Sequence, residues 1–517
     1  MTERFCTSPK ILLRGDILKK PVKILLVILM LSVSFIAFSC KSSTGSTDST
    51  AGNANTENVS VTDGTEGTTD IPFPYANDAI DLKGASFKIL TGQEWASDNL
   101  DIKDFDIEEM NGEVLNDAIY QRNIIIEEKY NLKFETIHAN DQLKTLMSRT
   151  IKSGIDEYDA VAPLLNHANL FAASGYAVNI YDTALSIDAP WWDQNILKST
   201  SVGGAAYYIA GDIFMKHYDG LAMLMFNKKL LAELGLESPY NLVNNNQWTI
   251  DKFNEMVKGV YLDLDNNSKK SRYDRFGFAT QVDYLISFIN GSGQSFMAKD
   301  GNDMPVFVGN SEKMSNVLDK VLAHYISDDT YCIHRDASKE GGWNSGNVPQ
   351  KWVFPEGRAL FYWGLPRFLD LYLRDMEDDF GIIPIPKWDS SQDRYYSTVN
   401  GWNSYTFMLP STVTDIERNS VILDAMAYYG RKLIKPAYYD VCLQRKYARD
   451  EESAAMLDII FSSAYYEPGG ASIFIDALCA AAQTGKVNLT SIYEKNQGKI
   501  DKAIQDLIAN YEKAAGK

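Results

Sequence analysis

The sequence predicts an α/β protein with mostly parallel sheets and more than one lobe, and two observations carry this prediction. Three strand-like segments, an apolar one at 87–90, one with alternating apolar and polar residues at 132–137 and a third at 158–161, alternate with stretches of helical periodicity at 114–129 and 143–151. This β-α-β-α-β order is typical of parallel strands joined by crossover helices. In addition, 517 residues that are 45% hydrophobic exceed what a single hydrophobic core usually holds.

The same alternation returns in the second half of the chain. Residues 222–226 have the pattern of a strand, and a helix is expected to begin at 227–229. The apolar runs 359–363 and 381–385 predict two later strands. Apolar residues at helical spacing over 500–511 predict a C-terminal helix. No repeat of fixed period is present, which argues against a solenoid or a propeller.

Residues 1–39 predict a secretory signal peptide. Three lysines between residues 19 and 23 precede an apolar run, 24–38, which ends at Ser39. A basic segment, an apolar segment of about 15 residues and a small residue before the cleavage point are the parts of such a peptide. A single membrane-spanning helix stays open as the alternative, although the run is short for that role.

Cys40 is predicted to carry a lipid. The segment Ala37-Phe38-Ser39-Cys40 resembles the bacterial lipobox, in which the cysteine is acylated and becomes the mature N-terminus. Residues 41–70 are almost wholly Ser, Thr, Gly, Asn, Asp and Glu, a composition typical of flexible linkers. We therefore expect residues 40–75 to tether a folded body to the outer face of the bacterial cytoplasmic membrane through more than one acyl chain.

The charge distribution excludes one class of partner. Residues 1–39 carry a net charge of +4, so the rest of the chain carries −22 of the total of −18. An acidic body of this size repels phosphate backbones, and we expect no nucleic-acid partner. The same acidity argues against a strongly anionic ligand, whereas the aromatic content of 12% suits a neutral ligand bound by ring faces.

The usual signatures of an enzyme are missing from the sequence. It contains no HExxH, GxSxG, GxxxxGK[ST] or GxGxxG motif. The cysteines Cys332, Cys442 and Cys479 are widely spaced and form no CxxC pair. We expect no enzymatic activity, although a pair of carboxylates meeting in a cleft, as in a glycosidase, stays open among 68 acidic residues.

Several short segments, taken in order, carry a resemblance to a known family. They are the strand at 87–90, EEKY at 127–130, YDAV at 158–161, ASGY at 173–176, FNKKLL at 226–231, FPEGRAL at 354–360 and GIIPIP at 381–386. In order and spacing, behind a lipobox and a linker, they resemble the extracellular solute-binding proteins of bacterial ABC importers. These are family 1, the kind that includes maltose-binding protein, and the match covers most of residues 85–510.

The resemblance implies a two-lobed, type II periplasmic-binding-protein-like fold with a hinged cleft between the lobes. Lobe one would comprise residues 76–220 and 355–405, and lobe two residues 221–354 and 406–517. Three crossings would join them, near 218–221, 356–361 and 400–407. A ligand that bridges both lobes would favour the closed form through contacts that it cannot make when the lobes are open.

Aromatic and polar residues at the carboxyl ends of the predicted strands, and at the hinge, are the candidate ligand contacts, because parallel sheets bind ligands at that edge. A pyranose offers apolar C–H faces for aromatic rings and hydroxyls for polar side chains. For each tryptophan, ordinary core packing is the alternative. The candidates are Glu94, Trp95, Asn166, His167, Tyr218, Asp219, Gln281, Tyr284, Trp343, Trp363, Arg367 and Trp402.

Asp263, Asp265, Asn267 and Asp274 form the one weak candidate for a metal site. Their spacing resembles that of a calcium loop, but the loop lacks the sharp-turn glycine and contains Lys269 and Lys270, which oppose a cation. A solvated turn with local Asx hydrogen bonds is the favoured interpretation, and we expect no cofactor.

The sequence as a whole predicts the substrate-binding subunit of an ABC transporter. It would be a monomer that is lipid-anchored outside the cytoplasmic membrane, captures a carbohydrate such as an oligosaccharide, and delivers it to the transmembrane permease subunits. A secreted glycoside hydrolase and a surface carbohydrate-binding or adhesion protein remain the alternatives.

Overall fold

The computed structural model describes residues 71–75, 80–92, 104–139, 142–336, 352–438 and 450–514. The predicted signal peptide, the lipidation site Cys40 and the linker up to residue 70 lie outside the described residues, as do Glu94, Trp95 and Trp343. Within the described part, no helix is long and apolar enough to cross a membrane.

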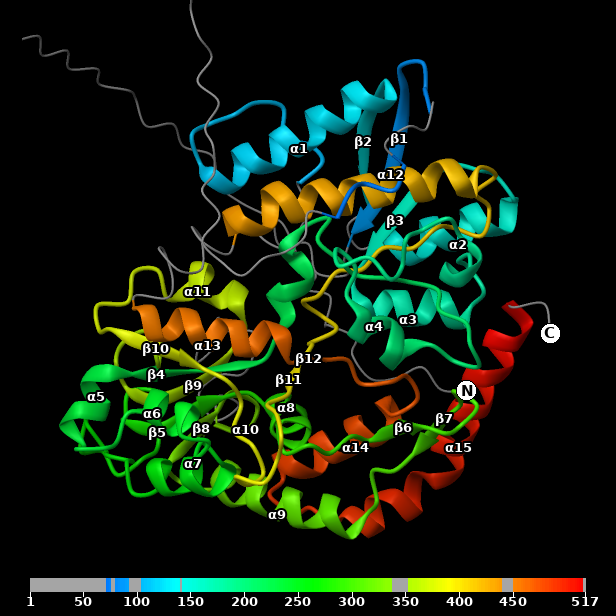
Figure 1. Ribbon diagram of the computed structural model, residues 1–517. Helices are drawn as coiled ribbons and strands as arrows, with labels where there is room; N and C mark the ends of the chain where they lie inside the picture. Colours follow the sequence, from blue (N-terminus) through cyan, green and yellow to red (C-terminus); the bar gives the residue numbers. More distant parts are fainter. Residues whose placement is uncertain are drawn as a thin grey trace, which may run out of the picture. The chain divides into compact units, whose positions relative to one another are not determined.

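The first sheet contains three parallel strands in the order β2-β1-β3 (Figure 1). These are β1(Ala85–Gly92), β2(Leu132–His138) and β3(Ala160–Pro163), and the helices α1(Val114–Tyr130) and α2(Leu143–Ser153) are the crossovers between them. Helix α1 ends where Asn131 adopts the left-handed conformation, at φ 48°, and turns the chain directly into β2. The predicted β-α-β-α-β unit is confirmed, and we call the elements around this sheet lobe one.

The second sheet contains five strands in the order β10-β4-β9-β5-β8. They are β4(Met223–Asn227), β5(Phe276–Thr280), β8(Thr330–Cys332), β9(Ala359–Gly364) and β10(Phe380–Ile383). Strand β4 pairs with β9 and β10 in antiparallel fashion, whereas β5 pairs with β8 and β9 in parallel. Every residue of these strands is buried, which explains their continuous apolar sequences. We call the elements around this sheet lobe two.

The other elements surround the two sheets. The remaining helices are α3(Leu165–Ala173), α4(Gln194–Thr200), α5(Lys228–Glu233), α6(Pro239–Asn244), α7(Ile250–Val257), α8(Tyr284–Gly291), α9(Glu312–Tyr325), α10(Ile333–Asp336), α11(Pro366–Tyr372), α12(Ile416–Tyr429), α13(Glu451–Ser462), α14(Ser472–Gln483) and α15(Leu489–Ala514). The 3-10 helices η2(Ile180–Asp182) and η3(Met215–Gly220), the π-helix η6(Gly430–Ile434) and the short strands β6(Met297–Lys299), β7(Pro305–Phe307), β11(Ser397–Thr398) and β12(Ala464–Tyr465) complete the described set.

The strand pairing corrects the predicted division into lobes. Strands β9 and β10 had been assigned to lobe one, but both lie in the sheet of lobe two. Conversely, residues after 405 had been assigned to lobe two, but Met408 bridges Val161 of β3, and α12 packs against α1. Residues 356–361 are therefore not a crossing. An apolar run predicts a buried strand but does not specify which strand it pairs with.

The chain passes between the two sheets through segments that lie side by side. Leu221 bridges Val399, and the N–H of Ala222 donates to the carbonyl of Thr398 at 2.8 Å. Strand β11 also pairs with β12, so a third segment joins the same group. These pairings agree with the predicted crossings at 218–221 and 400–407. We call residues 220–222, 397–400 and 463–466 the hinge segments.

The hinge requires glycine at position 220. A Cβ added to Gly220 would lie 2.8 Å from the carbonyl oxygen of Asn400 and 3.0 Å from the Cβ of Ser404. The N–H of Asn400 donates to the Gly220 carbonyl at 2.7 Å, so the two backbones are in direct contact here. A larger residue would force the crossing segments apart.

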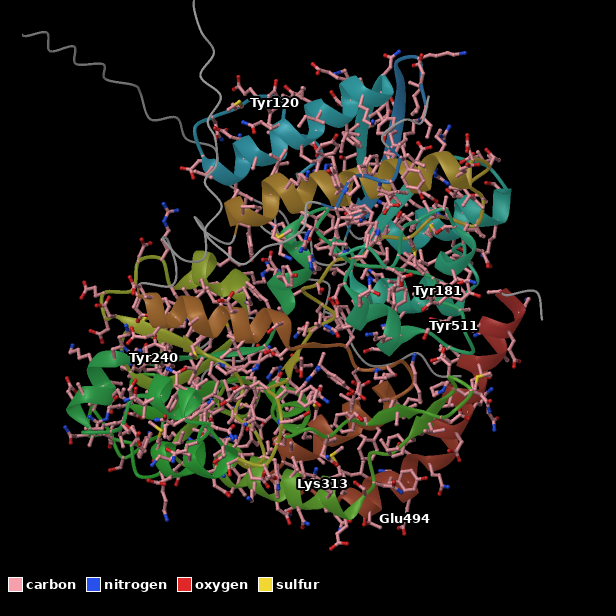
Figure 2. The ribbon with its side chains drawn as sticks, viewed as in Figure 1. Tyr120, Tyr181, Tyr240, Lys313, Glu494 and Tyr511 are labelled. Carbon is pink, nitrogen blue, oxygen red and sulfur yellow. The ribbon has the colours of Figure 1, made fainter. Side chains whose placement is uncertain are left out.

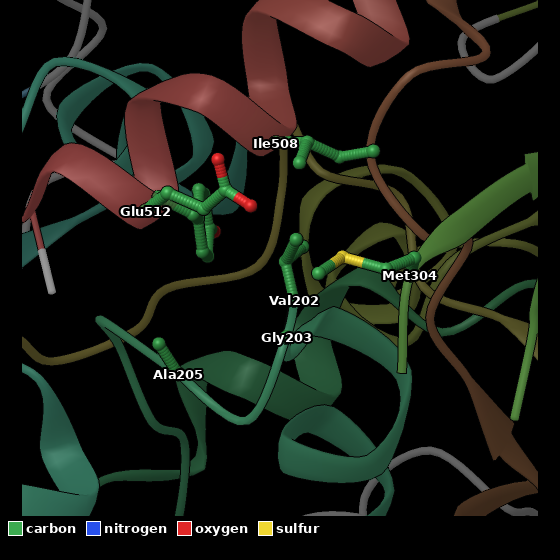
Figure 3. Close-up of a pocket in the computed structure, with 7 residues that line it drawn as sticks. Val202, Gly203, Ala205, Met304, Ile508 and Glu512 are labelled. Carbon is green, nitrogen blue, oxygen red and sulfur yellow. The ribbon is translucent and has the colours of Figure 1, made fainter. Parts of the chain in front are cut away.

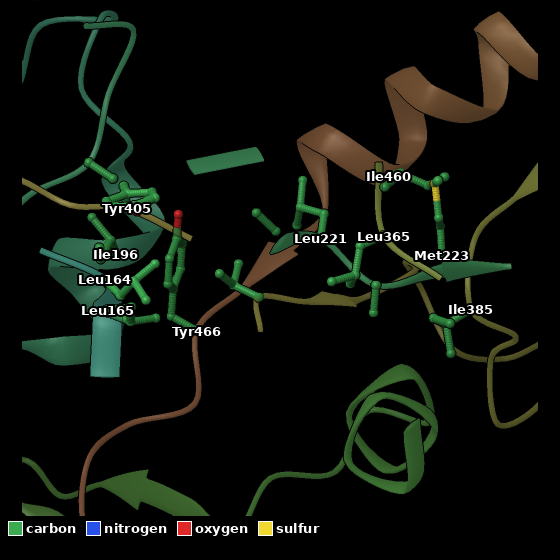
Figure 4. Close-up of a cluster of buried hydrophobic side chains, with 14 of the residues drawn as sticks. Leu164, Leu165, Ile196, Leu221, Met223, Leu365, Ile385, Tyr405, Ile460 and Tyr466 are labelled. Carbon is green, nitrogen blue, oxygen red and sulfur yellow. The ribbon is translucent and has the colours of Figure 1, made fainter. Parts of the chain in front are cut away.

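The apolar core continues from one lobe to the other across the hinge. Figure 4 shows part of it, in which Leu164 and Tyr405 of lobe one lie on one side, Leu221 and Tyr466 of the hinge segments lie between, and Met223 of lobe two lies on the other side. All five side chains are buried. The hinge is therefore packed with apolar side chains, and water has little access to its backbone hydrogen bonds.

A hairpin formed by β6 and β7 joins lobe two to residues 198–204 of lobe one. Asp303 accepts hydrogen bonds from the N–H of Gly204 at 3.0 Å and from the hydroxyl of Ser201 at 3.2 Å. The Asp303 carbonyl also accepts from the N–H of Gly203 at 3.0 Å. Lys299 donates to the Lys198 carbonyl and to Asp303. The lobes are thus connected at a second place besides the hinge segments.

Glu467, directly after β12, is predicted to give the protein a pH-dependent stability. Its carboxylate accepts from the N–H groups of Phe296 and Met297, both at 2.9 Å, and from the side-chain amide of Asn290 at 3.0 Å. Burial raises the pKa of Glu467 to about 7. Its folded-state pKa therefore exceeds the unfolded value of about 4.3, and we expect the stability contributed by proton binding to be present near pH 4 and lost as the pH rises to about 7.

Thermal unfolding between pH 5 and pH 8 tests this expectation. Glu467→Gln removes the titrating proton, so the melting temperature of this variant should vary less with pH than that of the wild type. Glu494→Gln, at an exposed position of α15 labelled in Figure 2, is the matched control and should follow the wild type. Equal pH profiles for Glu467→Gln and the wild type would contradict the assignment.

Candidate functional site

The 3-10 helix η3 brings Asp219 to the end of lobe one, directly before the hinge. Its carboxylate accepts a hydrogen bond from the Tyr438 hydroxyl at 3.0 Å and lies 3.7 Å from the ammonium of Lys216. Tyr438 follows η6, which packs against α1. Groups of lobe one thus hold the Asp219 carboxylate in place, and Asp219 remains partly exposed.

Arg367 reaches the same region from lobe two. It is the second residue of α11, a helix that begins at Pro366 directly after β9 and contacts η3. Its Nη1 donates to the side-chain oxygen of Asn403 at 2.9 Å, and its buried Nε has no hydrogen-bond acceptor among the described residues. Burial lowers the pKa of Arg367, and the negative charge of Asp219 opposes that change.

Asn166 and Trp402 complete this group. The N–H of Asn166 donates to the Gly401 carbonyl at 3.2 Å, and a Cβ at Gly401 would lie only 2.2 Å from the side-chain oxygen of Asn166, so a glycine is needed there. Trp402 is 42% exposed, and its backbone N–H donates to the side-chain oxygen of Asn400 at 2.9 Å. We call Asn166, Asp219, Arg367, Trp402 and Asn403 the hinge cluster.

Charged residues that the sequence did not single out surround the hinge cluster. Arg122 is fully buried on α1 and donates to the Ile213 carbonyl at 2.6 Å, which fixes the segment leading into η3. Burial lowers the pKa of Arg122 to about 10, and the nearby Asp104 opposes this shift. Burial raises the pKa of Asp104, against the positive charges of Lys216 and Arg122. Two acidic groups, Asp104 and Asp219, therefore lie among three basic groups around the site, Arg122, Lys216 and Arg367.

A signal for Arg122 was present in the sequence. Arg122 occupies the same face of α1 as the buried residues Ala118, Ile119 and Ile126. A lone charge on an apolar helix face needs partners in the interior, so this register identifies a structural or site residue. Asn403 and Tyr438 gave no such signal, because only the tertiary structure brings them to Arg367 and Asp219.

Other predicted contacts are placed in the core instead. Trp363 is 1% exposed within β9, and Tyr284 is fully buried on α8 among several aromatic rings. His167 is buried on α3 and stacks on Phe171 at 6.3 Å between ring centroids. The burial of these three rings contradicts the prediction that they stack on a ligand. Gln281 donates to Asp283 at 3.2 Å in lobe two.

Tyr218, the neighbour of Asp219, faces a different environment. Its ring packs on Phe461 of α13 at 4.7 Å between centroids and lines a cavity of about 160 Å³. A smaller cavity of about 40 Å³ lies between α15 and residues 202–205, with Met304 and Tyr511 in its wall (Figure 3). The smaller cavity has the volume of about one water molecule, so it cannot hold a sugar ring.

The acidic loop of the metal prediction is ordered by its own hydrogen bonds. Carboxylate oxygens of Asp263, Asp265 and Asp274 lie within 4.8 Å of one another. Asp274 is fully buried and accepts from the N–H groups of Leu264 at 3.2 Å and Ser271 at 2.8 Å. The N–H of Asn267 donates to Asp265 at 3.2 Å rather than leaving that carboxylate free.

One objection to a cation at this loop does not hold in the structure. Lys270 was expected to oppose a cation from within the loop. Its ammonium donates to the Thr330 carbonyl at 2.7 Å and lies 3.7 Å from Asp336, so its charge is paired with another part of lobe two. The loop forms a turn held by its own Asx hydrogen bonds, and the predicted absence of a cofactor stays a prediction.

Asp274→Ala is expected to lower the free energy of unfolding by about 1–3 kcal/mol, because two backbone N–H groups lose their buried acceptor. Asp265→Ala, at an exposed position, should cost less and is the matched control. Urea unfolding measures both. The same curves recorded with calcium and with EDTA test for a metal: coincident curves agree with the absence of a cofactor, whereas a midpoint that rises with calcium only in the wild type identifies a calcium site.

Comparisons with known proteins bear on the fold. No protein-family model and no curated protein sequence matches the chain. Among solved structures, it is similar to the ABC substrate-binding protein Lmo0181 from Listeria monocytogenes in complex with cycloalternan, with a TM-score of 0.53 and 10% identity over 82% of this chain and 99% of that chain. The chain is also similar to UspC from M. tuberculosis, with a TM-score of 0.53 and 13% identity over 80% of this chain and 100% of that chain.

The cyclic α-maltosyl-1,6-maltose binding protein from Arthrobacter globiformis is similar in the same way. The TM-score is 0.52, with 11% identity over 83% of this chain and 100% of that chain. At these identities the likeness concerns the fold. The chain has the two-lobed, type II periplasmic-binding-protein-like fold that ABC solute-binding proteins of the maltose-binding kind share.

Proposed function

We propose that this protein is the substrate-binding subunit of an ABC transporter and captures an extracellular carbohydrate, with oligosaccharides as the favoured class. The observation that carries the proposal is the hinge cluster. It places polar side chains from both lobes, and one exposed tryptophan, at the point where the chain crosses between them. The structures with a similar fold include a complex with cycloalternan and a cyclic α-maltosyl-1,6-maltose binding protein.

Capture depends on groups that belong to different lobes. Asn166 and Asp219 belong to lobe one and Arg367 to lobe two, whereas Trp402 lies on a crossing segment. A ligand that contacts Arg367 and Asp219 together stabilises only the orientation of the lobes in which both are within reach. Its binding free energy therefore shifts the equilibrium toward that orientation.

The chemistry of the hinge cluster suits a neutral sugar. The exposed ring of Trp402 offers a face for the apolar C–H groups of a pyranose. Asp219 and Asn166 can accept hydrogen bonds from sugar hydroxyls, and Arg367 can donate to ring and hydroxyl oxygens. An anionic ligand would be repelled by the carboxylates of Asp104 and Asp219, which lie beside the basic groups of the site.

Delivery and localisation are part of the same proposal. The sugar-loaded protein would dock on the transmembrane subunits of a permease that is driven by a separate ATPase. Acylated Cys40 and the linker to residue 75 would keep it at the outer face of the cytoplasmic membrane, where two-dimensional diffusion brings it to the permease. The lipobox-like segment and the linker support the membrane anchor, and the shared fold supports docking on a permease.

Two alternatives make different predictions. A glycoside hydrolase with an aromatic cleft would convert an oligosaccharide to shorter products, which chromatography of an incubated sample detects. A surface adhesion protein would bind without a change in lobe orientation. Small-angle scattering separates it from a transporter subunit, for which we expect a smaller radius of gyration in the presence of ligand.

Trp402→Ala and Arg367→Ala are expected to weaken binding of the best oligosaccharide by about 5- to 100-fold each, since ring stacking or a charge-assisted hydrogen bond is worth about 1–3 kcal/mol. Calorimetric titration against a panel of neutral oligosaccharides measures the affinities. Trp352→Ala removes an exposed tryptophan of lobe two that does not belong to the hinge cluster. It is the control and should bind like the wild type. Wild-type affinity in both hinge variants would rule out this site.

A further inference from the structure

The cavity beside Tyr218 is built by both lobes. Lobe one contributes residues 190–195, residues of 211–218 and Lys435, and lobe two contributes Phe461 and Ser462 at the end of α13. Its volume of about 160 Å³ corresponds to about five water molecules. Drug-sized ligands need about 300 Å³ or more, so this cavity suits a molecule of one small ring. We call it the hinge pocket.

The strongest polar feature of the hinge pocket is His217. The side chain is 2% exposed, and its Nδ1 lies 3.0 Å from the Phe214 carbonyl oxygen. Because a carbonyl only accepts, Nδ1 carries the proton and Nε2 is left as an acceptor. No described residue donates to this buried Nε2. Burial lowers the pKa of His217, which keeps the ring neutral and Nε2 able to accept.

Two carboxylates add acceptors without adding net charge. Asp193 accepts from the Tyr466 hydroxyl at 2.7 Å and from the N–H of Asn195 at 2.8 Å. Asp212 lies 3.1 Å from Arg431 and 3.3 Å from Lys435, so its charge is compensated. A carboxylate offers about four acceptor positions, and both retain some. The pocket is therefore rich in acceptors but carries no unpaired cation for an anion.

Aromatic rings form the apolar part of the wall. Tyr218 and Phe461 pack with an angle of 30° between their planes, and Trp191 and Trp192 lie in the opposite lobe-one segment. The indole N–H groups of both tryptophans donate to the buried Asp424, at 3.0 and 2.7 Å, so these rings are fixed. Rings combined with acceptors match a compound that has C–H faces and several hydroxyls.

We propose that the hinge pocket is a second binding site, for a neutral polyhydroxyl compound about the size of one pyranose. It is separate from the hinge cluster, with which it shares no residue. The hydroxyls of the bound compound donate to Nε2 of His217 and to the carboxylates of Asp193 and Asp212. One face of the compound packs on the Tyr218–Phe461 pair. Because the wall comes from both lobes, occupancy also favours one lobe orientation and couples to binding at the hinge cluster.

Saturation-transfer NMR with D-glucose as the probe tests the site on the full mature chain. We expect saturable binding to the wild type in the millimolar range. Ser462→Trp, at an exposed position on the rim, fills the pocket and should weaken binding at least tenfold, whereas Ser462→Ala should stay within twofold of the wild type. D-glucuronate should bind at least tenfold more weakly than glucose, since its charge has no partner.

Three further variants keep the result decisive. Asp193→Asn retains a side chain that can cap α4 and should weaken glucose binding even if Ser462→Trp fails to fold. Arg367→Ala and Trp402→Ala should leave glucose binding within twofold while they weaken the oligosaccharide. The proposal is overturned if the wild type shows no saturable glucose binding, or if binding survives the pocket variants and is lost in the hinge-cluster variants. Neither result bears on the oligosaccharide titration.

Discussion

The close contact of backbones at the hinge is the constraint on which the rest of the structure depends. Gly220 touches the carbonyl of Asn400, and the next residues pair with 397–399 and, through them, with 463–465. Because these segments are hydrogen-bonded to one another and packed with apolar side chains, they behave as one unit. The positions of Asp219, directly before the hinge, and of Trp402, directly after it, follow from that unit.

Charged residues of both signs lie close together near the hinge. Arg122 and Asp104 are both buried, and each shifts the pKa of the other toward its charged form. Asp219 lies near Lys216 and opposes the lowered pKa of Arg367. A ligand without charge can bind beside these groups without disturbing their interactions.

The sequence was a good guide to the elements and a poor guide to their partners. The strand at 132–137 was predicted because apolar and polar residues alternate along it, and the strands at 87–90 and 359–363 because buried strands are continuous apolar runs. The same property hides the neighbour of a strand, so 359–363 was assigned to the wrong lobe. It also explains why Trp363 was wrongly predicted to contact a ligand, because both faces of β9 are covered and no residue of that strand is exposed. Trp402, in contrast, lies on a crossing segment outside the sheets and is exposed.

The hairpin that carries Asp303 has a mechanical consequence. The hinge segments alone would allow one lobe both to bend and to twist relative to the other. Asp303 adds a bonded point outside the hinge, through Gly203, Gly204 and Ser201. As long as these bonds persist, they restrain the twist of one lobe relative to the other. Motion of the lobes is thereby biased toward bending at the hinge, which is the direction of opening and closing.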